Sequence, residues 1–205
     1  LQRNLKIRYD ITRTARNELH RHGFMEVETP MLTKSTPEGA RDYLVPSRLN
    51  PQKFYALPQS PQLFKQILMV SGMDKYFQIV KCFRDEDLRQ DRQPEFTQID
   101  VEMSFGNEKI LFQMIEEMMA AIYKEVLNEE IKTPFPILKY QDAIDRFGTD
   151  KPDMRIDMEI VDLAEIVRGT KFKVFAQVLE SGGQIRALNI KNSADSLSRK
   201  ALDDL

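Results

Sequence analysis

The chain has 205 residues, with 30 Lys or Arg against 32 Asp or Glu, and its formal net charge is −2. This balance excludes a surface that is basic overall, as in proteins that wrap nucleic acid, but not a local basic patch. A composition of 41% hydrophobic and 30% charged residues is that of a globular chain, not a disordered or collagen-like one. No apolar run reaches the ~18 residues of a membrane span. The single cysteine excludes an internal disulfide and fits a reducing compartment, so we expect a cytoplasmic protein.

The first third of the chain predicts a helix, a short strand and a long loop. Apolar positions three and four residues apart predict an amphipathic helix over residues 5–22, which Gly23 ends. These positions are Leu5, Tyr9, Thr12, Ala15 and Leu19. Residues 24–29 predict a strand that stops before Pro30, since proline donates no ladder hydrogen bond. Residues 33–53 predict a loop whose length favours a functional role.

The middle of the chain predicts a strand, a helix and a hairpin. Residues 54–57 predict the strand, and residues 60–71 predict the helix, with a proline in its first turn. Residues 76–84 and 95–105 predict two strands joined by the charged loop 85–94. That spacing is typical of an antiparallel hairpin with a long tip.

The last part of the chain predicts a change of domain. Asn107 predicts the N-cap of a helix, residues 133–136 an extended linker, and residues 140–147 a short helix. The apolar face of the first of these helices is Leu111, Met114, Ile115, Met118, Ile122 and Val126. We expect domains over 1–152 and 153–205. The order of elements argues for an α+β fold, with an antiparallel sheet flanked by helices and then part of a small α+β domain.

Both ends of the chain look cut. It starts at Leu1 rather than Met, and it stops at Leu205 inside a helical pattern with no capping glycine. No repeat recurs at a fixed period. We therefore expect a fragment of a longer protein.

One predicted strand carries an unusual polar face. Alternation places Thr97, Ile99, Val101 and Met103 on a core face. It places Phe96, Gln98, Asp100 and Glu102 on the other face. Two carboxylates, an amide and a ring suit a floor for a ligand with an amine and a flat ring. A solvent-exposed antiparallel face has the same pattern, and the residues alone leave both interpretations open.

Two more segments offer charged groups. Arg84 at a strand end, followed by Asp85 and Glu86, suits a phosphate, because a planar guanidinium clamps two oxygens. Gln62 and Lys65 lie three residues apart, so they share a helix face on which a small anion would bind. Surface ion pairs and solvated side chains explain these residues as well, and they are the commoner case.

Other catalytic signatures are weak or missing. Ser60 is a candidate N-cap of the predicted helix over 60–71. Cys82 lies in an apolar strand, which indicates a buried inert thiol. The sequence holds no phosphate-binding glycine loop, nucleophile elbow or zinc spacing, and its two neighbouring histidines, His20 and His22, do not favour a metal site.

Longer strings resemble a known family. Residues 23–32 resemble motif 1 of the class II aminoacyl-tRNA synthetases, and residues 83–96 resemble motif 2. Three further strings narrow the resemblance to the bacterial-type aspartyl-tRNA synthetases: STPEGARDY at 35–43, LPQSPQLFKQ at 57–66 and DRQPEFTQID at 91–100. From about residue 155 the chain resembles the start of that family's insertion domain. The resemblance covers the whole chain, and the three strings are highly specific.

The resemblance implies an activity. The full-length protein would activate L-aspartate with ATP to aspartyl-adenylate and transfer the aspartyl group to the 3′ end of tRNA(Asp). Mg²⁺ is expected with ATP, without assigned protein ligands. The motif 1 helix and strand would form a homodimer interface. Motif 3, the anticodon-reading barrel and a later histidine and arginine of the family are absent here, so we expect the chain alone to be inactive.

The resemblance also assigns residues. Lys65 would pair with the side-chain carboxylate of aspartate, and Glu38 would close over it on a mobile loop. Arg84 would be the catalytic residue, bridging the substrate carboxylate and the α-phosphate. The aspartate-binding residues would be Glu38, Ser60, Gln62, Lys65, Arg84 and Asp100. The ATP-binding residues would be Arg84, Asp85, Glu86, Gln93 and Phe96, with Phe96 stacked on adenine. The loop 87–92 would reach the acceptor end of the tRNA.

Two other functions remain as alternatives. One is a synthetase-like binding or regulatory paralogue without tRNA charging, against which intact Glu38, Lys65, Arg84 and Phe96 count. The other is a synthetase-like asparagine synthetase, against which the start of the insertion domain counts. A relaxed enzyme that also charges asparagine tRNA stays open, because the missing anticodon reader largely makes that choice.

Overall fold

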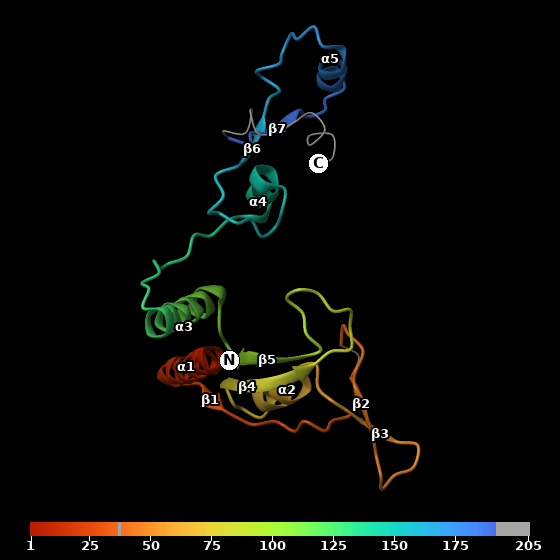
Figure 1. Ribbon diagram of the computed structural model, residues 1–205, viewed down its shortest axis with the longest axis vertical. Helices are drawn as coiled ribbons and strands as arrows, with labels where there is room; N and C mark the ends of the chain where they lie inside the picture. Colours follow the sequence, from red (N-terminus) through yellow and green to blue (C-terminus); the bar gives the residue numbers. More distant parts are fainter. Residues whose placement is uncertain (37, 192–205) are drawn as a thin grey trace. The chain divides into compact units, whose positions relative to one another are not determined.

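The computed structural model describes residues 1–36 and 38–191 (Figure 1). The chain divides into two compact units, Leu1–Phe135 and Pro136–Leu205. The division between the units precedes the domain boundary that we predict near residue 152, and that boundary stays a prediction. The helical pattern at the end of the chain lies outside the described residues.

A three-stranded sheet forms the centre of the first unit, in the order β1 (Met25–Glu26), β4 (Lys75–Phe83) and β5 (Glu95–Met103). β4 and β5 pair antiparallel along all nine residues of each, which confirms the predicted hairpin. β1 pairs parallel with β4, and it covers only part of the predicted strand over 24–29. The α+β class is confirmed, but the sheet is mixed rather than antiparallel. The reason is that a long crossover, not a hairpin turn, connects β1 to β4.

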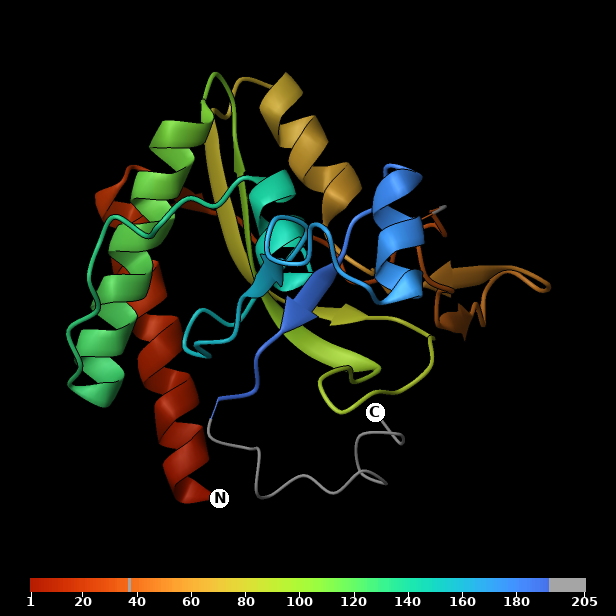
Figure 2. The same ribbon diagram turned by 90° about the horizontal axis from the view of Figure 1, so that it is seen from above.

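Helices cover both faces of this sheet (Figures 1 and 2). α1 (Gln2–Arg21) and α3 (Glu108–Leu127) pack against each other on one face, and α2 (Gln62–Val70) lies on the other. The core on the α1–α3 side contains Ala15, Leu19, Phe24, Phe77, Met114, Met118 and Ile122. Ile99, Val101 and Met103 of β5 pack against this core, as alternation predicts. The polar residues of β5 are thereby directed to the α2 side.

The ends of the predicted helices are largely confirmed. Asn107 is the N-cap of α3, and its Oδ1 accepts a hydrogen bond from the backbone N–H of Ile110 at 3.0 Å. Gly72 follows the end of α2 with φ of +93°, a conformation that residues other than glycine rarely adopt.

The predicted apolar face of α3 has one exposed member. Met114, Met118 and Ile122 are buried, but Leu111 is 40% exposed.

The buried stripe of α1 differs in part from the predicted one. Ala15 and Leu19 are fully buried as predicted, but Leu5 and Tyr9 are 58% and 61% exposed. Tyr9 is six residues from Ala15, which at ~100° per residue places it about 120° around the helix axis. Ile11 packs against the core in its place. The predicted apolar face therefore differs from the core-facing one at Tyr9, whereas Ala15 and Leu19 belong to both.

The loop over 33–53 contains a strand that the sequence did not predict. β2 (Leu44–Pro46) pairs antiparallel with β3 (Phe54–Ala56). Three residues that include a proline carry almost no period-two signal, which explains the omission. Thr33 and Ala56 also exchange backbone hydrogen bonds of 3.0 and 2.8 Å. The loop is thereby attached to the segment that leads into α2.

The second unit contains two helices and a two-stranded sheet. α4 (Tyr140–Phe147) confirms the predicted short helix, and α5 (Lys173–Glu180) follows later. β6 (Ile160–Asp162) pairs antiparallel with β7 (Arg186–Leu188). Over residues 1–36 and 38–191, no helix is both long enough and apolar enough to cross a membrane.

Candidate functional site

The face of the sheet that α2 covers is polar and buried. Gln78 of β4 lies opposite Asp100 of β5, and Tyr76 lies opposite Glu102. Gln78 is 6% exposed and Asp100 is 8% exposed, whereas Tyr76 has no exposed surface. A solvated antiparallel face, the open alternative for this strand, is therefore wrong at Asp100. Buried polar groups of this kind need partners.

Lys65 supplies the cation at the centre of this face. Its Nζ donates to Oδ1 of Asp100 at 2.9 Å and lies 3.2 Å from Oε2 of Glu102. The Lys65 side chain is only 11% exposed, so the solvated interpretation of Lys65 is also wrong. Burial alone would lower the pKa of Lys65, but the hydrogen bonds and charges of Asp100 and Glu102 hold it above 10.5. The ammonium is therefore charged at neutral pH.

Two buried polar atoms next to this cluster lack a hydrogen-bond partner within residues 1–36 and 38–191. They are Oδ2 of Asp100, an acceptor, and Nε of Arg84, a donor. A buried polar group without a partner costs about 1–3 kcal/mol, so such groups indicate sites where another molecule supplies the partner. A ligand with an amine for Asp100 and an anionic oxygen for Arg84 would satisfy both.

Arg84 and Phe96 form a second part of the site. The guanidinium carbon of Arg84 lies 5.0 Å from the centroid of the Phe96 ring, a cation–π distance. The backbone N–H of Arg84 donates to the carbonyl of Pro94 at 2.9 Å, which closes the base of the hairpin loop. Glu86 is half-buried on that loop, and Gln93 is exposed. The structure thus brings Arg84 and Phe96 together, with Glu86 and Gln93 on the loop beyond them.

The segment before α2 holds the loop that carries Glu38. Oγ of Ser60 donates to Oε2 of Glu38 at 3.1 Å. The buried amide of Gln59 accepts from the backbone N–H of Ala40 at 3.0 Å and donates to the carbonyl of Ala40 at 2.8 Å. The N-cap of α2 is Pro61, without a side-chain capping bond, so Ser60 as the N-cap is wrong. Ser60 is instead a contact of Glu38.

The remaining predicted residues lie around these two groups. Gln62 is half-buried in the first turn of α2, three residues before Lys65. The backbone N–H of Asp85 donates to the carbonyl of Arg41 at 3.0 Å, and its carboxylate lies 3.8 Å from Nε of Arg41. Asp85 therefore connects the motif 2 loop to the loop that carries Glu38.

The roles that the resemblance implies include neither Glu102 nor Gln59, although Glu102 lies on the polar face that the alternation predicts. Glu102 is the second carboxylate on Lys65, and Gln59 holds the backbone of the Glu38 loop. The signal for Glu102 was present, because alternation puts it on the same face as Asp100. Nothing in the local pattern distinguishes Gln59 from the glutamines that surround it.

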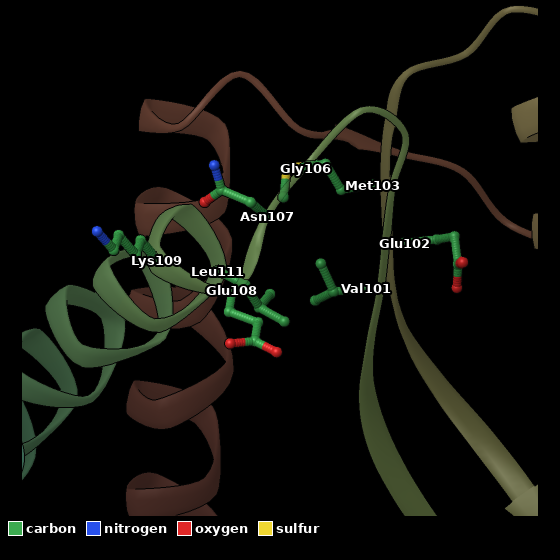
Figure 3. Close-up of a pocket in the computed structure, with 8 residues that line it drawn as sticks. All are labelled: Val101, Glu102, Met103, Gly106, Asn107, Glu108, Lys109 and Leu111. Atoms are coloured by element: carbon green, nitrogen blue, oxygen red, sulfur yellow. The ribbon is translucent and has the colours of Figure 1, made fainter. Parts of the chain in front are cut away.

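A cavity that is open to solvent lies elsewhere in the first unit, away from this site. Its volume is about 900 Å³, at the turn between β5 and α3, and its lining is Val101, Glu102, Met103, Gly106, Asn107, Glu108, Lys109 and Leu111. In Figure 3, Val101 and Leu111 point toward this space, and the carboxylate of Glu102 points away to the other side of the strand. The cavity is therefore on the opposite face from Lys65, and it is not our candidate site.

Cys82 yields a prediction about reactivity. Its thiol is fully buried and donates to Oε1 of Gln98 at 3.2 Å. Burial, and then the charge of Asp100, raise the pKa of Cys82 to about 11. At pH 8 the thiolate fraction is then roughly 100-fold smaller than for a pKa of 9.0. We expect native full-length protein to be alkylated by iodoacetamide at least about 100-fold more slowly than urea-unfolded protein, measured by mass spectrometry of the Cys82 peptide.

The same pKa sets a dependence of stability on pH. A raised pKa favours the protonated thiol in the folded state. The contribution of Cys82 to stability is therefore full below pH 9 and is lost as the pH rises toward 11.

The alkylation experiment has a clear contrary outcome. Alkylation of Cys82 in the native protein as fast as in the unfolded protein would contradict the buried placement of this thiol.

Comparisons with known proteins agree with the resemblance. Over its full length the chain is 59% identical to the aspartate–tRNA ligase of Exiguobacterium sibiricum and spans 35% of that protein. It is 58% identical to the aspartate–tRNA(Asp/Asn) ligases of Heliobacterium modesticaldum and Aquifex aeolicus, and it spans 34% of each. The chain thus covers about a third of the relatives it matches. The model of the family described as "tRNA synthetases class II (D, K and N)" matches residues 1–197, so the chain belongs to that family.

Proposed function

We propose that the full-length protein is an aspartate–tRNA ligase, which activates L-aspartate with ATP and transfers it to tRNA(Asp). The observation that carries this proposal is the buried Lys65, held between Asp100 and Glu102 next to a carboxylate oxygen for which the described residues supply no hydrogen-bond partner. The names of the similar proteins support the same substrate. A binding or regulatory paralogue has no need of this arrangement together with Arg84 and Phe96.

The buried charges explain how aspartate would be recognised. Lys65 would pair with the side-chain carboxylate, and Oδ2 of Asp100 would accept from the amino group, near Ser60 and Gln62. Glu38, held by Ser60, would cover the bound amino acid. Asparagine would be rejected, because a buried ammonium that faces a neutral amide is left poorly paired.

Arg84 and Phe96 would hold the nucleotide. The guanidinium of Arg84 would bridge the substrate α-carboxylate and the α-phosphate, with adenine on the Phe96 ring and Asp85, Glu86 and Gln93 around the nucleotide. The α-carboxylate would attack the α-phosphorus in line, and the bond to pyrophosphate would break. Positioning and charge stabilisation then do most of the catalysis, because no protein nucleophile is needed.

The second step would release AMP. A terminal ribose hydroxyl of the tRNA would attack the acyl carbon of aspartyl-adenylate, forming the ester and expelling AMP. The loop over 87–92 would approach the acceptor end of the tRNA. Residues 153–205 would begin the insertion domain.

Mg²⁺ would accompany ATP, and the described residues offer no group of ligands for it. Within residues 1–36 and 38–191, no three side chains of the His, Cys, Asp and Glu types gather as metal ligands. We therefore assign Mg²⁺ no residue of this chain and derive no step through it.

The protein would act as a homodimer in the cytoplasm. The exposed Leu5 and Tyr9 of α1 support a dimer interface on this helix, because they offer apolar surface that the described core does not bury.

The test is aspartate-dependent exchange of pyrophosphate into ATP, with asparagine as the matched control substrate. We expect exchange by the full-length protein with aspartate, at least about 100-fold above that with asparagine. We expect none from this chain alone, since it spans about a third of its relatives. No exchange by the full-length protein would contradict the proposed function, and exchange by this chain would contradict its inactivity.

A relaxed ligase is the second candidate. The relatives carry both names, aspartate–tRNA ligase and aspartate–tRNA(Asp/Asn) ligase, at nearly the same identity. Charging of tRNA(Asp) and tRNA(Asn) by the full-length protein, measured side by side with aspartate, separates the two.

A further inference from the structure

A buried glutamine near the candidate site has no role in the proposed function. Gln59 is 3% exposed, and its side-chain amide makes three hydrogen bonds to the loop that carries Glu38. Its Oε1 accepts from the backbone N–H of Ala40 at 3.0 Å, and its Nε2 donates to the Ala40 carbonyl at 2.8 Å and to Oδ1 of Asp42 at 2.5 Å. One side chain thus binds both backbone polar groups of Ala40, two residues beyond Glu38.

These bonds fix the orientation of the Gln59 amide. Both protons of its Nε2 are donated, one to the Ala40 carbonyl and one to Asp42. A flipped amide would place its oxygen against two acceptors and its nitrogen against a donor, so it would lose all three bonds. Asp42 is held in turn, because its Oδ2 accepts from Oγ of Ser35 at 2.6 Å. The chain is therefore held on both sides of Glu38.

The anchor for these bonds is rigid. Gln59 and Ser60 are flanked by a proline on each side, and proline rings fix their own φ and restrict the residue that precedes them. The carbonyl of Pro58 accepts from a backbone N–H of β4 at 3.0 Å, which attaches the anchor to the sheet. Ser60 donates to the Glu38 carboxylate at 3.1 Å. Two consecutive residues of one rigid segment thus bind the side chain of Glu38 and the backbone beyond it.

We propose that Gln59 is a positioning residue of the amino-acid site: it holds the loop backbone so that the Glu38 carboxylate stays beside Ser60, where it meets the bound aspartate. Without the three bonds of Gln59 the loop would adopt more conformations, and ordering it again on binding costs free energy. This inference rests on the proposed function, because it requires Glu38 to contact aspartate.

The test is the KM for aspartate in pyrophosphate exchange by the full-length protein. Gln59→Met keeps the length of the side chain and removes its hydrogen bonds to Ala40 and Asp42. We expect the KM for aspartate to rise about tenfold, while the KM for ATP changes less than about twofold. The exposed Gln66→Met is the matched control, with wild-type constants expected. An unchanged KM for aspartate in a folded Gln59→Met protein would overturn the proposal.

A double-mutant cycle with Glu38→Ala separates positioning from structural support. If Gln59 acts through Glu38, its substitution matters only while the Glu38 carboxylate is present. We therefore expect Gln59→Met to raise the KM for aspartate less than about twofold in the Glu38→Ala background. The same rise in both backgrounds would overturn the proposal, because a general loss of support weakens binding with or without Glu38.

Asp42 offers a test if Gln59→Met does not fold. Asp42→Asn keeps an acceptor for Gln59 and a polar group for Ser35, so we expect a KM for aspartate within about twofold of wild type. Asp42→Leu removes both bonds at nearly the same shape, and we expect this KM to rise about threefold. Equal KM values in these two variants would overturn the proposal. The proposed function fails separately, and only if the wild-type protein shows no aspartate-dependent exchange.

Discussion

Replacing Lys65 with Met in the full-length protein is expected to reduce aspartate-dependent pyrophosphate exchange by about a thousandfold. The substitution removes the only cation that contacts Asp100 and Glu102 in the described contacts, and with it the partner for the substrate carboxylate. Removing one member of a buried charged pair costs about 3–5 kcal/mol, which corresponds to a loss of this size. Lys53→Met, at an exposed position, is the matched control and should retain wild-type exchange.

The same substitution is expected to lower stability. The Asp100 carboxylate is 8% exposed and would lose its ion pair, while the Glu102 side chain, at 34% exposed, remains partly solvated. We therefore expect a fall in Tm, measured by thermal unfolding, and exchange must be assayed well below that Tm. A folded Lys65→Met protein with wild-type exchange would show that Lys65 does not bind the substrate.

Replacing Arg84 with Lys is expected to reduce exchange by at least about 100-fold and to raise the KM for ATP. An ammonium carries the same charge, but it lacks the planar fork that clamps two oxygens and stacks on a ring. The structure suits both features, since Nε of Arg84 is buried with no hydrogen-bond partner among the described residues and the guanidinium lies over Phe96.

Steady-state exchange at varied ATP measures this effect. Arg48→Lys, at an exposed position, makes the same chemical change away from the site and should leave both constants unaltered. Unchanged exchange in Arg84→Lys would mean that this side chain acts through its charge alone, which would contradict the bridging role.

The local elements were predictable because their information is local. The N-cap at Asn107 and the apolar face of α3 depend on residues a few positions apart, and each strand of the β4–β5 hairpin carries its own alternation on either side of a single loop. Periodicity and capping report such relations directly. The strings at 35–43, 57–66 and 91–100 likewise identified the family without any three-dimensional information.

The state of the candidate site could not be predicted in the same way. From the residues alone, Lys65 and Asp100 suited a solvated face as well as a pocket, because their pairing joins positions 35 residues apart. The bond from Thr29 to Gln78 joins positions 49 apart. Only the packing of α2 and β1 against β4 and β5 brings these groups together, and only their burial makes the pairing strong.

The sequence by itself determined the family, the main helices and the hairpin, and the residues that face each side of β5. The tertiary structure alone decided that the sheet is mixed, that Glu102 shares Lys65 with Asp100, and that Oδ2 of Asp100 has no hydrogen-bond partner in the described part of the chain. The physical reason is that patterns along a chain record which face a residue occupies, whereas charge pairing and hydrogen bonding depend on which other segment covers that face.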